Sequence, residues 1–245
     1  LGDEALLLPA SALRAQFAAA GITDADEVIA SCGSGVNACH MITKQDTGQL
    51  QTFRVVAIVT GAGRGIGKAT AKVYAREGAK VVLASRTQAN IDKVVEEIRA
   101  EGGTALGVAT DVGKKADMFN MVAKTVEAFG TVNILVNNAQ GFGTEKNPRA
   151  STIPTPIEDT DDEEWDYTFR TGATATLWGM QAVFPYMKEH GGRIINFSSG
   201  SGLEGFPGNT CYNATKEAIR AVRGMNEAQA TDYLASKTDA LRYRD

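Results

Sequence analysis

The stretch "TGAGRGIG", Thr60–Gly67, follows the apolar run "VVAIVT" (55–60) and leads into a helix-prone segment. Gly61 permits a tight turn, Gly65 lets backbone N–H groups approach a pyrophosphate, and Gly67 allows close packing of the helix. The start of the helix adds about half a positive charge beneath the phosphates. A glycine-rich turn alone would also suit a plain strand-to-helix connection, but this strand–turn–helix context favours a dinucleotide site.

The same alternation of strand and helix continues along the chain. Further apolar runs are "KVVLAS" (80–85), "TALGVAT" (104–110), "VNILVN" (132–137) and "RIINFS" (193–198). Near-continuous apolar strands are typical of a parallel sheet that is covered on both faces. The segments between them end at Gly78, Gly102 and Gly130. Thr87 is the expected cap of the second helix, and the acidic run 161–164 suits a helix start. The sequence predicts an α/β fold, a Rossmann-like doubly wound parallel sheet, with its ligand crevice at the carboxyl ends of the strands.

Composition narrows the classes of partner. The chain has 245 residues, a net charge of −4, 43% hydrophobic and 22% charged residues, as is ordinary for a globular protein. The negative charge argues against nucleic acid as a partner, and no apolar run has the roughly 20 residues of a membrane helix. Three cysteines make no disulfide framework and favour a reducing, cytoplasmic location. Cys39 and His40 lack a second ligand pair, so we expect no metal site.

The end of the second strand indicates which dinucleotide binds. A carboxylate there would bind a ribose 2′-hydroxyl, but "ASRT" (84–87) places Arg86 in that region. Arg86 and Arg64 could both contact a 2′-phosphate, which favours NADP. Two merely solvated arginines are the alternative, so NAD stays open.

A second motif, "YNATK" (212–216), carries acid–base chemistry. Tyr212 and Lys216 lie four residues apart, so a helix places them on one face, about 5–6 Å apart at their Cβ atoms. A neighbouring ammonium favours a phenolate, so we expect Lys216 to lower the pKa of Tyr212. This spacing alone arises often by chance.

The combination of "TGAGRGIG", "NNA" (137–139), "NFSSG" (196–200) and "YNATK" in this order resembles the short-chain dehydrogenase/reductase family over about residues 53–223. The resemblance implies hydride transfer between a nicotinamide and a carbonyl or alcohol substrate. It assigns Ser199 to the substrate oxygen, Tyr212 to proton exchange and Lys216 to tuning of Tyr212. The cofactor-binding set it implies, with the arginines above, is Gly61, Arg64, Gly65, Ile66, Gly67, Arg86, Asp111, Val112, Asn138 and Ala139, together with Tyr212 and Lys216.

The chain departs from the family pattern in four places. Gln140 stands where the family has glycine, and Gly172 where it has an asparagine that holds a water between the lysine and solvent. The segment 140–164 is long and shows neither helical nor strand periodicity. Residues 224–245 read as a polar, helix-prone tail where the family has a sixth strand, a Pro-Gly motif and a lid. If the protein ended at Asp245, we would expect dinucleotide binding with little turnover.

Residues 1–52 carry a different pattern. "EVIASC" reads as a short strand that ends at Cys32, and "GSGVNACHMI" as a loop that enters a helix, a setting that lowers a thiol pKa. Residues 8–42 resemble the active-site region of rhodanese-type sulfurtransferases, particularly those acting on mercaptopyruvate. The resemblance implies that Cys32 carries a persulfide. A half-buried thiol in a partial α/β appendage is the alternative.

These observations support three hypotheses. The first is an NAD(P)-dependent oxidoreductase that acts on a small carbonyl or alcohol, with turnover depending on the missing family elements. The second is a sulfurtransferase that uses Cys32, and the third is a non-catalytic dinucleotide-binding or interaction module. The family commonly pairs through the helices expected at Glu163–Met187 and Thr210–Arg223, so we expect a homodimer or tetramer.

Overall fold

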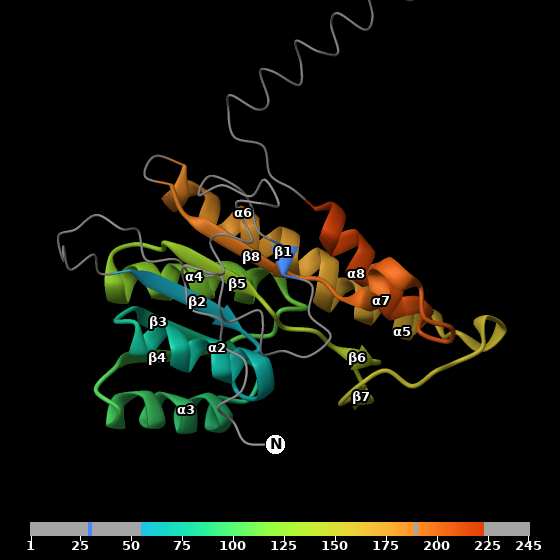
Figure 1. Cartoon of the computed structure of the whole chain (residues 1–245), viewed down its shortest axis with the longest axis horizontal. Helices are drawn as coiled ribbons and strands as arrows, with labels where there is room; N and C mark the ends of the chain where they lie inside the picture. Colours follow the sequence, from blue (N-terminus) through green and yellow to red (C-terminus); the bar gives the residue numbers. More distant parts are fainter. Residues whose placement is uncertain (1–28, 31–54, 189–190, 223–245) are drawn as a thin grey trace, which may run out of the picture.

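The computed structural model describes residues 29–30, 55–188 and 191–222. Within these residues the core is one parallel six-stranded sheet in the order β1-β8-β5-β2-β3-β4 (Figure 1). Its strands are β1 (Ile29–Ala30), β2 (Val56–Thr60), β3 (Lys80–Ser85), β4 (Thr104–Ala109), β5 (Ile134–Asn137) and β8 (Arg193–Phe197). All of the pairings in this sheet are parallel, which confirms the predicted fold class.

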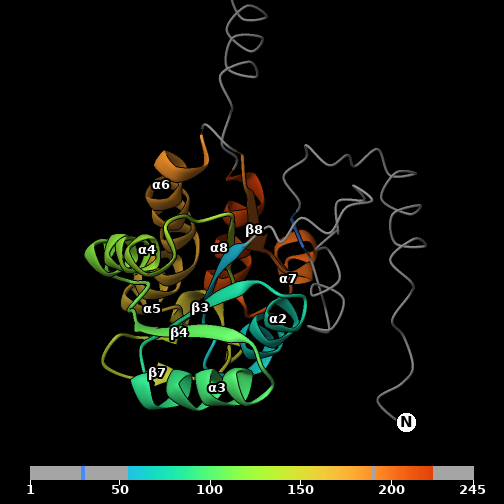
Figure 2. The same ribbon diagram turned by 90° about the vertical axis from the view of Figure 1, so that its left-hand side faces the viewer.

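Helices cover both faces of the sheet, as Figure 2 shows. On one face, α2 (Gly65–Arg76) and α3 (Gln88–Ala100) pack against Ala57 and Val59. On the other, α4 (Lys115–Phe129) and α6 (Ala175–Met187) pack against Ile58. Successive β2 residues thus enter opposite cores, because side chains alternate along a strand. The near-continuous apolar strands reflect this double burial.

The order of strands fixes the position of the crevice. From β2 the chain proceeds to β3 and β4 on one side, and β5 and β8 lie on the other. The change of direction falls between β2 and β5, which pair from Ala57 with Ile134 to Val59 with Val136. Ligands of open α/β sheets bind at this point, outside the carboxyl ends of the strands. The glycine-rich turn after β2 lies at this end.

The helical stretch predicted for residues 163–187 has three parts. α5 (Asp162–Phe169) is followed by a π-helical segment, Arg170–Thr174, and then by α6. The Asp161 side chain caps α5 by accepting from the Glu163 N–H, as the acidic run predicted. The Thr87 prediction is half right, because Thr87 precedes α3 but its hydroxyl makes no capping bond. The π-helical segment was not predicted, since it leaves the apolar pattern unbroken.

The long segment after β5 contains short elements that the sequence did not predict. A small antiparallel hairpin joins β6 (Phe142–Gly143) and β7 (Pro148–Arg149), and a 3₁₀ turn covers Ile157–Asp159. After β8 come α7 (Gly200–Glu204), also not predicted, and α8 (Thr210–Ala221), which matches the last expected helix.

Two residues of the amino-terminal segment belong to the sheet. β1 pairs with the carboxyl end of β8, Ile29 opposite Asn196 and Ala30 opposite Phe197. This is the strand expected within "EVIASC". The other residues of the segment 1–52, including Cys32, and residues 223–245 lie outside the described residues, so the sulfurtransferase-like pattern and the expected tail are not tested. Among the described helices, none has the length and apolarity that crossing a membrane requires.

Candidate active site

The glycine-rich turn has the backbone geometry that the sequence predicted. Gly61 adopts a φ of +68°, which side chains disfavour. A Cβ atom on Gly67 would lie 2.4 Å from the Gly61 carbonyl oxygen, so only glycine fits there. A Cβ on Gly65, the first residue of α2, would meet nothing within 4 Å, which leaves room above the helix start. Arg64, Gly65 and Ile66 are exposed on this turn. Such a turn can accept a pyrophosphate.

Hydrogen bonds join the turn to the end of β5. The Thr60 hydroxyl oxygen accepts from the backbone N–H groups of Asn138 (3.0 Å) and Ala139 (3.1 Å). The Asn138 side-chain amide donates to the Thr60 carbonyl at 2.9 Å. The side chains of Thr60 and Asn138 therefore fix the crevice floor between β2 and β5. Thr60 itself was missed as a site residue, although it opens the quoted motif.

Asp111 and Val112 follow β4 at the same end of the sheet. The Asp111 carboxylate accepts a hydrogen bond from the Gly113 N–H at 3.0 Å. The backbone N–H of Asp111 donates to the Asp117 carboxylate at 2.9 Å. The Val112 side chain is buried. These bonds hold the turn between β4 and α4 in place. The family resemblance implies that the adenine of the cofactor lies beside this turn.

Arg86, the residue expected to read the 2′-phosphate, is exposed just beyond β3. Its guanidinium donates to the Tyr167 hydroxyl of α5 at 2.8 Å. Tyr167 is itself buried, and the Arg170 guanidinium lies 5.8 Å from the centre of its ring. No sequence pattern predicts this partner, because only the fold brings residues 86 and 167 together.

Ser199, Tyr212 and Lys216 come together at the ends of β8 and α8. A hydrogen bond joins the Ser199 and Tyr212 hydroxyls. The Ser199 oxygen also accepts from the Ser201 N–H at 3.1 Å, which fixes it at the start of α7. The Lys216 ammonium lies 5.5 Å from the centre of the Tyr212 ring and donates to the Phe197 carbonyl at 2.8 Å. The fold thus assembles the three predicted catalytic side chains.

Burial controls the ionisation of this set. It raises the pKa of Tyr212, and the hydrogen bond to Ser199 offsets part of the rise. It lowers the pKa of Lys216 to about 8, because the ammonium is almost fully desolvated. The expectation that Lys216 lowers the pKa of Tyr212 is wrong for this structure. Desolvation raises the pKa of Tyr212, and the Lys216 ammonium donates to a backbone carbonyl instead of to the phenol oxygen.

The lowered pKa of Lys216 predicts a pH-dependent stability. The pKa of Lys216 is 10.5 in the unfolded chain and about 8 in the folded chain. Between these pH values the lysine is protonated only in the unfolded chain, so unfolding takes up a proton. Stability should therefore rise from about pH 8 to pH 10, by about 1 kcal/mol per pH unit. Above pH 10 the raised pKa of Tyr212 acts in the opposite direction.

Urea unfolding at pH 7.5, 8.5 and 9.5 measures this slope. Lys216→Met should remove it, whereas Lys124→Met, at an exposed position of α4, should leave it unchanged. An equal slope in Lys216→Met and in the unaltered protein would show that the rise has another origin.

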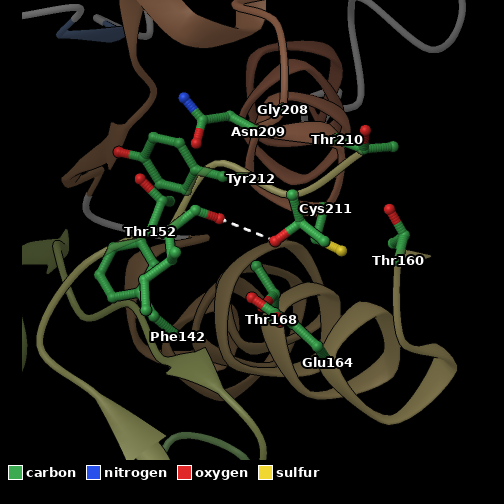
Figure 3. A pocket seen from close by; sticks show the side chains of 12 residues that line it. Phe142, Thr152, Thr160, Glu164, Thr168, Gly208, Asn209, Thr210, Cys211 and Tyr212 are labelled. Atoms are coloured by element: carbon green, nitrogen blue, oxygen red, sulfur yellow. Dashed lines mark hydrogen bonds between the residues drawn. The ribbon is translucent and has the colours of Figure 1, made fainter. Parts of the chain in front are cut away.

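A small hollow is lined by Tyr212 and by residues of α5 and of the segment after β5 (Figure 3). α5, the start of α8 and the segment after β5 enclose it, and the Phe142 ring lies 5.4 Å from the Tyr212 ring. Its lining includes Phe142, Ile153, Glu164, Thr168, Cys211 and Tyr212. Burial, with a smaller effect of Glu164, raises the pKa of Cys211, so this thiol is a poor nucleophile. The long segment after β5 thus supplies the wall that the sequence could not predict.

The structure does not test the cysteine hypothesis, because Cys32 lies outside the described residues. Within the described part of the chain, no group of three or more acidic, histidine or cysteine side chains could hold a metal ion.

Comparisons with known proteins agree with this geometry. The chain is 37% identical over 166 residues to an uncharacterized oxidoreductase of Listeria monocytogenes, which covers 67% of this chain and 63% of that protein. It is 38% identical over 183 residues to the trans-4-hydroxycyclohexanecarboxylate dehydrogenase of Sinomonas cyclohexanicum, covering 72% and 66%. A 12alpha-hydroxysteroid dehydrogenase of Clostridium sp. is 36% identical over 185 residues, covering 73% and 67%. The chain thus spans about two thirds of the length of these relatives.

A solved structure gives the same result. The alcohol dehydrogenase of the archaeon Thermococcus sibiricus, complexed with 5-hydroxy-NADP, matches with a TM-score of 0.62 and 28% identity, covering 68% of this chain and 67% of that one. The family model of the short chain dehydrogenases matches residues 55–237, which extends beyond the limit of 223 expected from the motifs. The chain therefore belongs to the short-chain dehydrogenase family.

Proposed function

We propose that this protein transfers a hydride between NADP(H) and a carbonyl/alcohol pair. The observation that carries the proposal is the position of Ser199, Tyr212 and Lys216, which meet beyond the carboxyl end of β8, at the edge of the sheet from which the glycine-rich turn also leaves β2. The match to the short chain dehydrogenase family and the dehydrogenase relatives support it. The chain spans only about two thirds of the length of those relatives. We therefore propose the activity for the whole protein.

In this proposal each side chain has a separate task. A bound NADPH supplies the hydride, and the Ser199 hydroxyl donates a hydrogen bond to the substrate oxygen. Tyr212 donates its proton to that oxygen as negative charge develops. The raised pKa of Tyr212 keeps the phenol protonated at neutral pH, which suits reduction. Alcohol oxidation needs the phenolate and should therefore be favoured at higher pH.

The turn and the neighbouring side chains fit a dinucleotide. Gly67 lets α2 start close to Gly61, and the open space above Gly65 accepts phosphates. Asp111 and Val112 would line the adenine side, and Asn138 and Ala139 the path along the crevice. Arg86 would contact the 2′-phosphate, since no carboxylate follows β3. The NADP derivative named for the Thermococcus sibiricus structure supports the choice of NADP.

Arg86→Ala should weaken NADPH binding and leave NADH binding nearly unchanged. The gap between the two affinities should narrow by about 1–3 kcal/mol, the range for a hydrogen bond to a charged group. Fluorescence titration of both cofactors measures this gap. Arg76→Ala is the control, because Arg76 pairs with Glu101 at the far end of α2. Tighter binding of NADH by the unaltered protein would contradict the assignment.

We propose a cyclic secondary alcohol, or the matching ring ketone, as the substrate class. The names of two relatives support this, since one acts on trans-4-hydroxycyclohexanecarboxylate and the other on a 12alpha-hydroxysteroid. NADPH oxidation with a series of ring ketones and linear ketones tests it. Activity confined to linear ketones or aldehydes would contradict the substrate class but leave hydride transfer intact.

We also propose that the protein is a homodimer or tetramer, that it is cytoplasmic, and that residues 8–42 form a sulfurtransferase-like appendage. Exposed Trp165, Leu177 and Phe184 on α5 and α6 support a homodimer. The cysteine count supports a cytoplasmic location. The motif around Cys32 supports a sulfurtransferase-like origin for residues 8–42, which we treat as an appendage to the dehydrogenase domain.

A further inference from the structure

Arg86 follows a strand end that is joined to the glycine-rich turn. The Ala62 N–H of the turn donates to the Ala84 carbonyl of β3 at 3.1 Å. A Cβ atom on Gly63 would lie 3.4 Å from the Ser85 hydroxyl oxygen, so the two backbones approach closely here. Arg86 is exposed directly after this contact. Its side chain therefore leaves the edge of the sheet next to the turn that accepts the pyrophosphate.

The Tyr167 side chain is fixed from the other side of the crevice. It is 4% exposed, and a Cβ atom on Gly141 would lie 2.8 Å from its ring. The Thr171 hydroxyl accepts from the Gly141 N–H at 3.0 Å and donates to the Tyr167 carbonyl at 2.8 Å. The hydrogen bond of 2.8 Å from Arg86 to the Tyr167 hydroxyl thus links the segments that follow β3 and β5, the two neighbours of β2 in the sheet.

The two arginines that contact Tyr167 differ in their charge partners. Arg170, whose guanidinium lies 5.8 Å from the ring centre, forms an ion pair with Glu145. Among the described residues, no carboxylate pairs with Arg86. A guanidinium has five N–H donors, and the Tyr167 hydroxyl accepts from only one of its nitrogens. Arg86 therefore keeps its positive charge and enough donors for a bidentate contact with a phosphate.

The hydroxyl that holds Arg86 is neutral and rigidly placed. An exposed arginine has many rotamers, and it loses this freedom when it binds an anion. A side chain that a partner already holds in the binding position loses less freedom, so the anion binds more tightly. A carboxylate in place of the hydroxyl would hold the arginine as well, but it would cancel the charge that attracts the anion.

We propose that Tyr167 is a specificity-determining residue for the cofactor, because its hydroxyl holds the Arg86 guanidinium where it binds the 2′-phosphate of NADP(H). The inference rests on the proposed function, which assigns the 2′-phosphate to Arg86. NAD(H) carries a neutral hydroxyl at that position of the ribose and gains no comparable contact. Tyr167 acts through Arg86 and is therefore a positioning residue.

Tyr167→Phe removes the hydroxyl and keeps the buried ring. Adenosine 2′,5′-bisphosphate and AMP are the probes, since they differ only in the 2′-phosphate and need no hydride transfer. By calorimetry we expect the variant to bind the bisphosphate about three- to tenfold more weakly, the effect of ordering one long side chain, and to bind AMP as before. Tyr186→Phe, at an exposed position of α6, is the control and should change neither affinity.

A double substitution separates positioning from a purely structural role. In the Arg86→Ala protein, Tyr167→Phe should have no further effect on the affinity for the bisphosphate, because the residue on which it acts is gone. Equal losses of affinity for both nucleotides, an unchanged or tighter affinity for the bisphosphate in Tyr167→Phe, or the same loss with and without Arg86 would each overturn the proposal.

A crystal structure of the unaltered protein with the bisphosphate tests the same claim without a variant. Arg86 should contact the 2′-phosphate and the Tyr167 hydroxyl together. An Arg86 side chain that has left Tyr167 in the complex would overturn the proposal. If the unaltered protein binds the bisphosphate no more tightly than AMP, the NADP assignment of the proposed function fails as well, so the two failures are distinguishable.

Discussion

Tyr212→Phe should lower kcat for ketone reduction by a factor of about 10² to 10⁴, the range for loss of a general acid. The change removes one hydroxyl and keeps the ring, which packs against Phe142. NADPH affinity should fall by less than kcat, because the substitution removes only one of the expected cofactor contacts and leaves the glycine-rich turn, Arg86 and Lys216 unchanged. Single-turnover oxidation of NADPH measures the rate even if turnover is slow.

Tyr186→Phe is the matched control for this substitution. Tyr186 is an exposed tyrosine on α6 and has no part in the proposed chemistry. It should retain the unaltered rate. If Tyr212→Phe also retains the rate, another group donates the proton and the assignment of Tyr212 is wrong.

Gly67→Ala should weaken dinucleotide binding about tenfold or more and destabilise the fold. The added methyl carbon would lie 2.4 Å from the Gly61 oxygen and 2.7 Å from the Asn138 side-chain nitrogen. The first contact is with backbone, so the turn or the start of α2 must move, at a cost of about 1–3 kcal/mol. Thermal unfolding and NADPH titration of the same samples separate the two effects.

Ala69→Val, at an exposed position of α2, is the control for added volume in this helix. It should leave the affinity for NADPH nearly unchanged. An unaltered NADPH affinity in Gly67→Ala, with the fold intact, would show that the dinucleotide does not bind over this turn.

Most of the sheet was predictable because its strands are buried on both faces. The apolar runs from Val55 to Ser198 correspond to β2, β3, β4, β5 and β8 within one or two residues at each end. Helical spacing predicted that Tyr212 and Lys216 would share one face, and the family resemblance implied that Ser199 would join them. The strands and the Tyr212–Lys216 pair depend on patterns that are local in the chain.

What the sequence did not predict depends on contacts between distant residues. The hydrogen bond from Arg86 to Tyr167 spans 81 residues, and that from Gln140 to Thr168 spans 28. The π-helical segment arises without a break in the apolar pattern. The pKa of Tyr212 could not be judged from its distance to Lys216, because burial, which depends on the whole fold, dominates it.

The most direct test of the account is the transfer of deuterium from NADPH labelled at the transferring position of the nicotinamide. The protein is mixed with the labelled cofactor and a ring ketone, and the alcohol is analysed by mass spectrometry. We predict that the alcohol carries one deuterium on the carbinol carbon, and that Tyr212→Phe forms it at least about 100-fold more slowly. Unlabelled alcohol, no alcohol despite bound NADPH, or equal rates in the two proteins would contradict hydride transfer assisted by Tyr212.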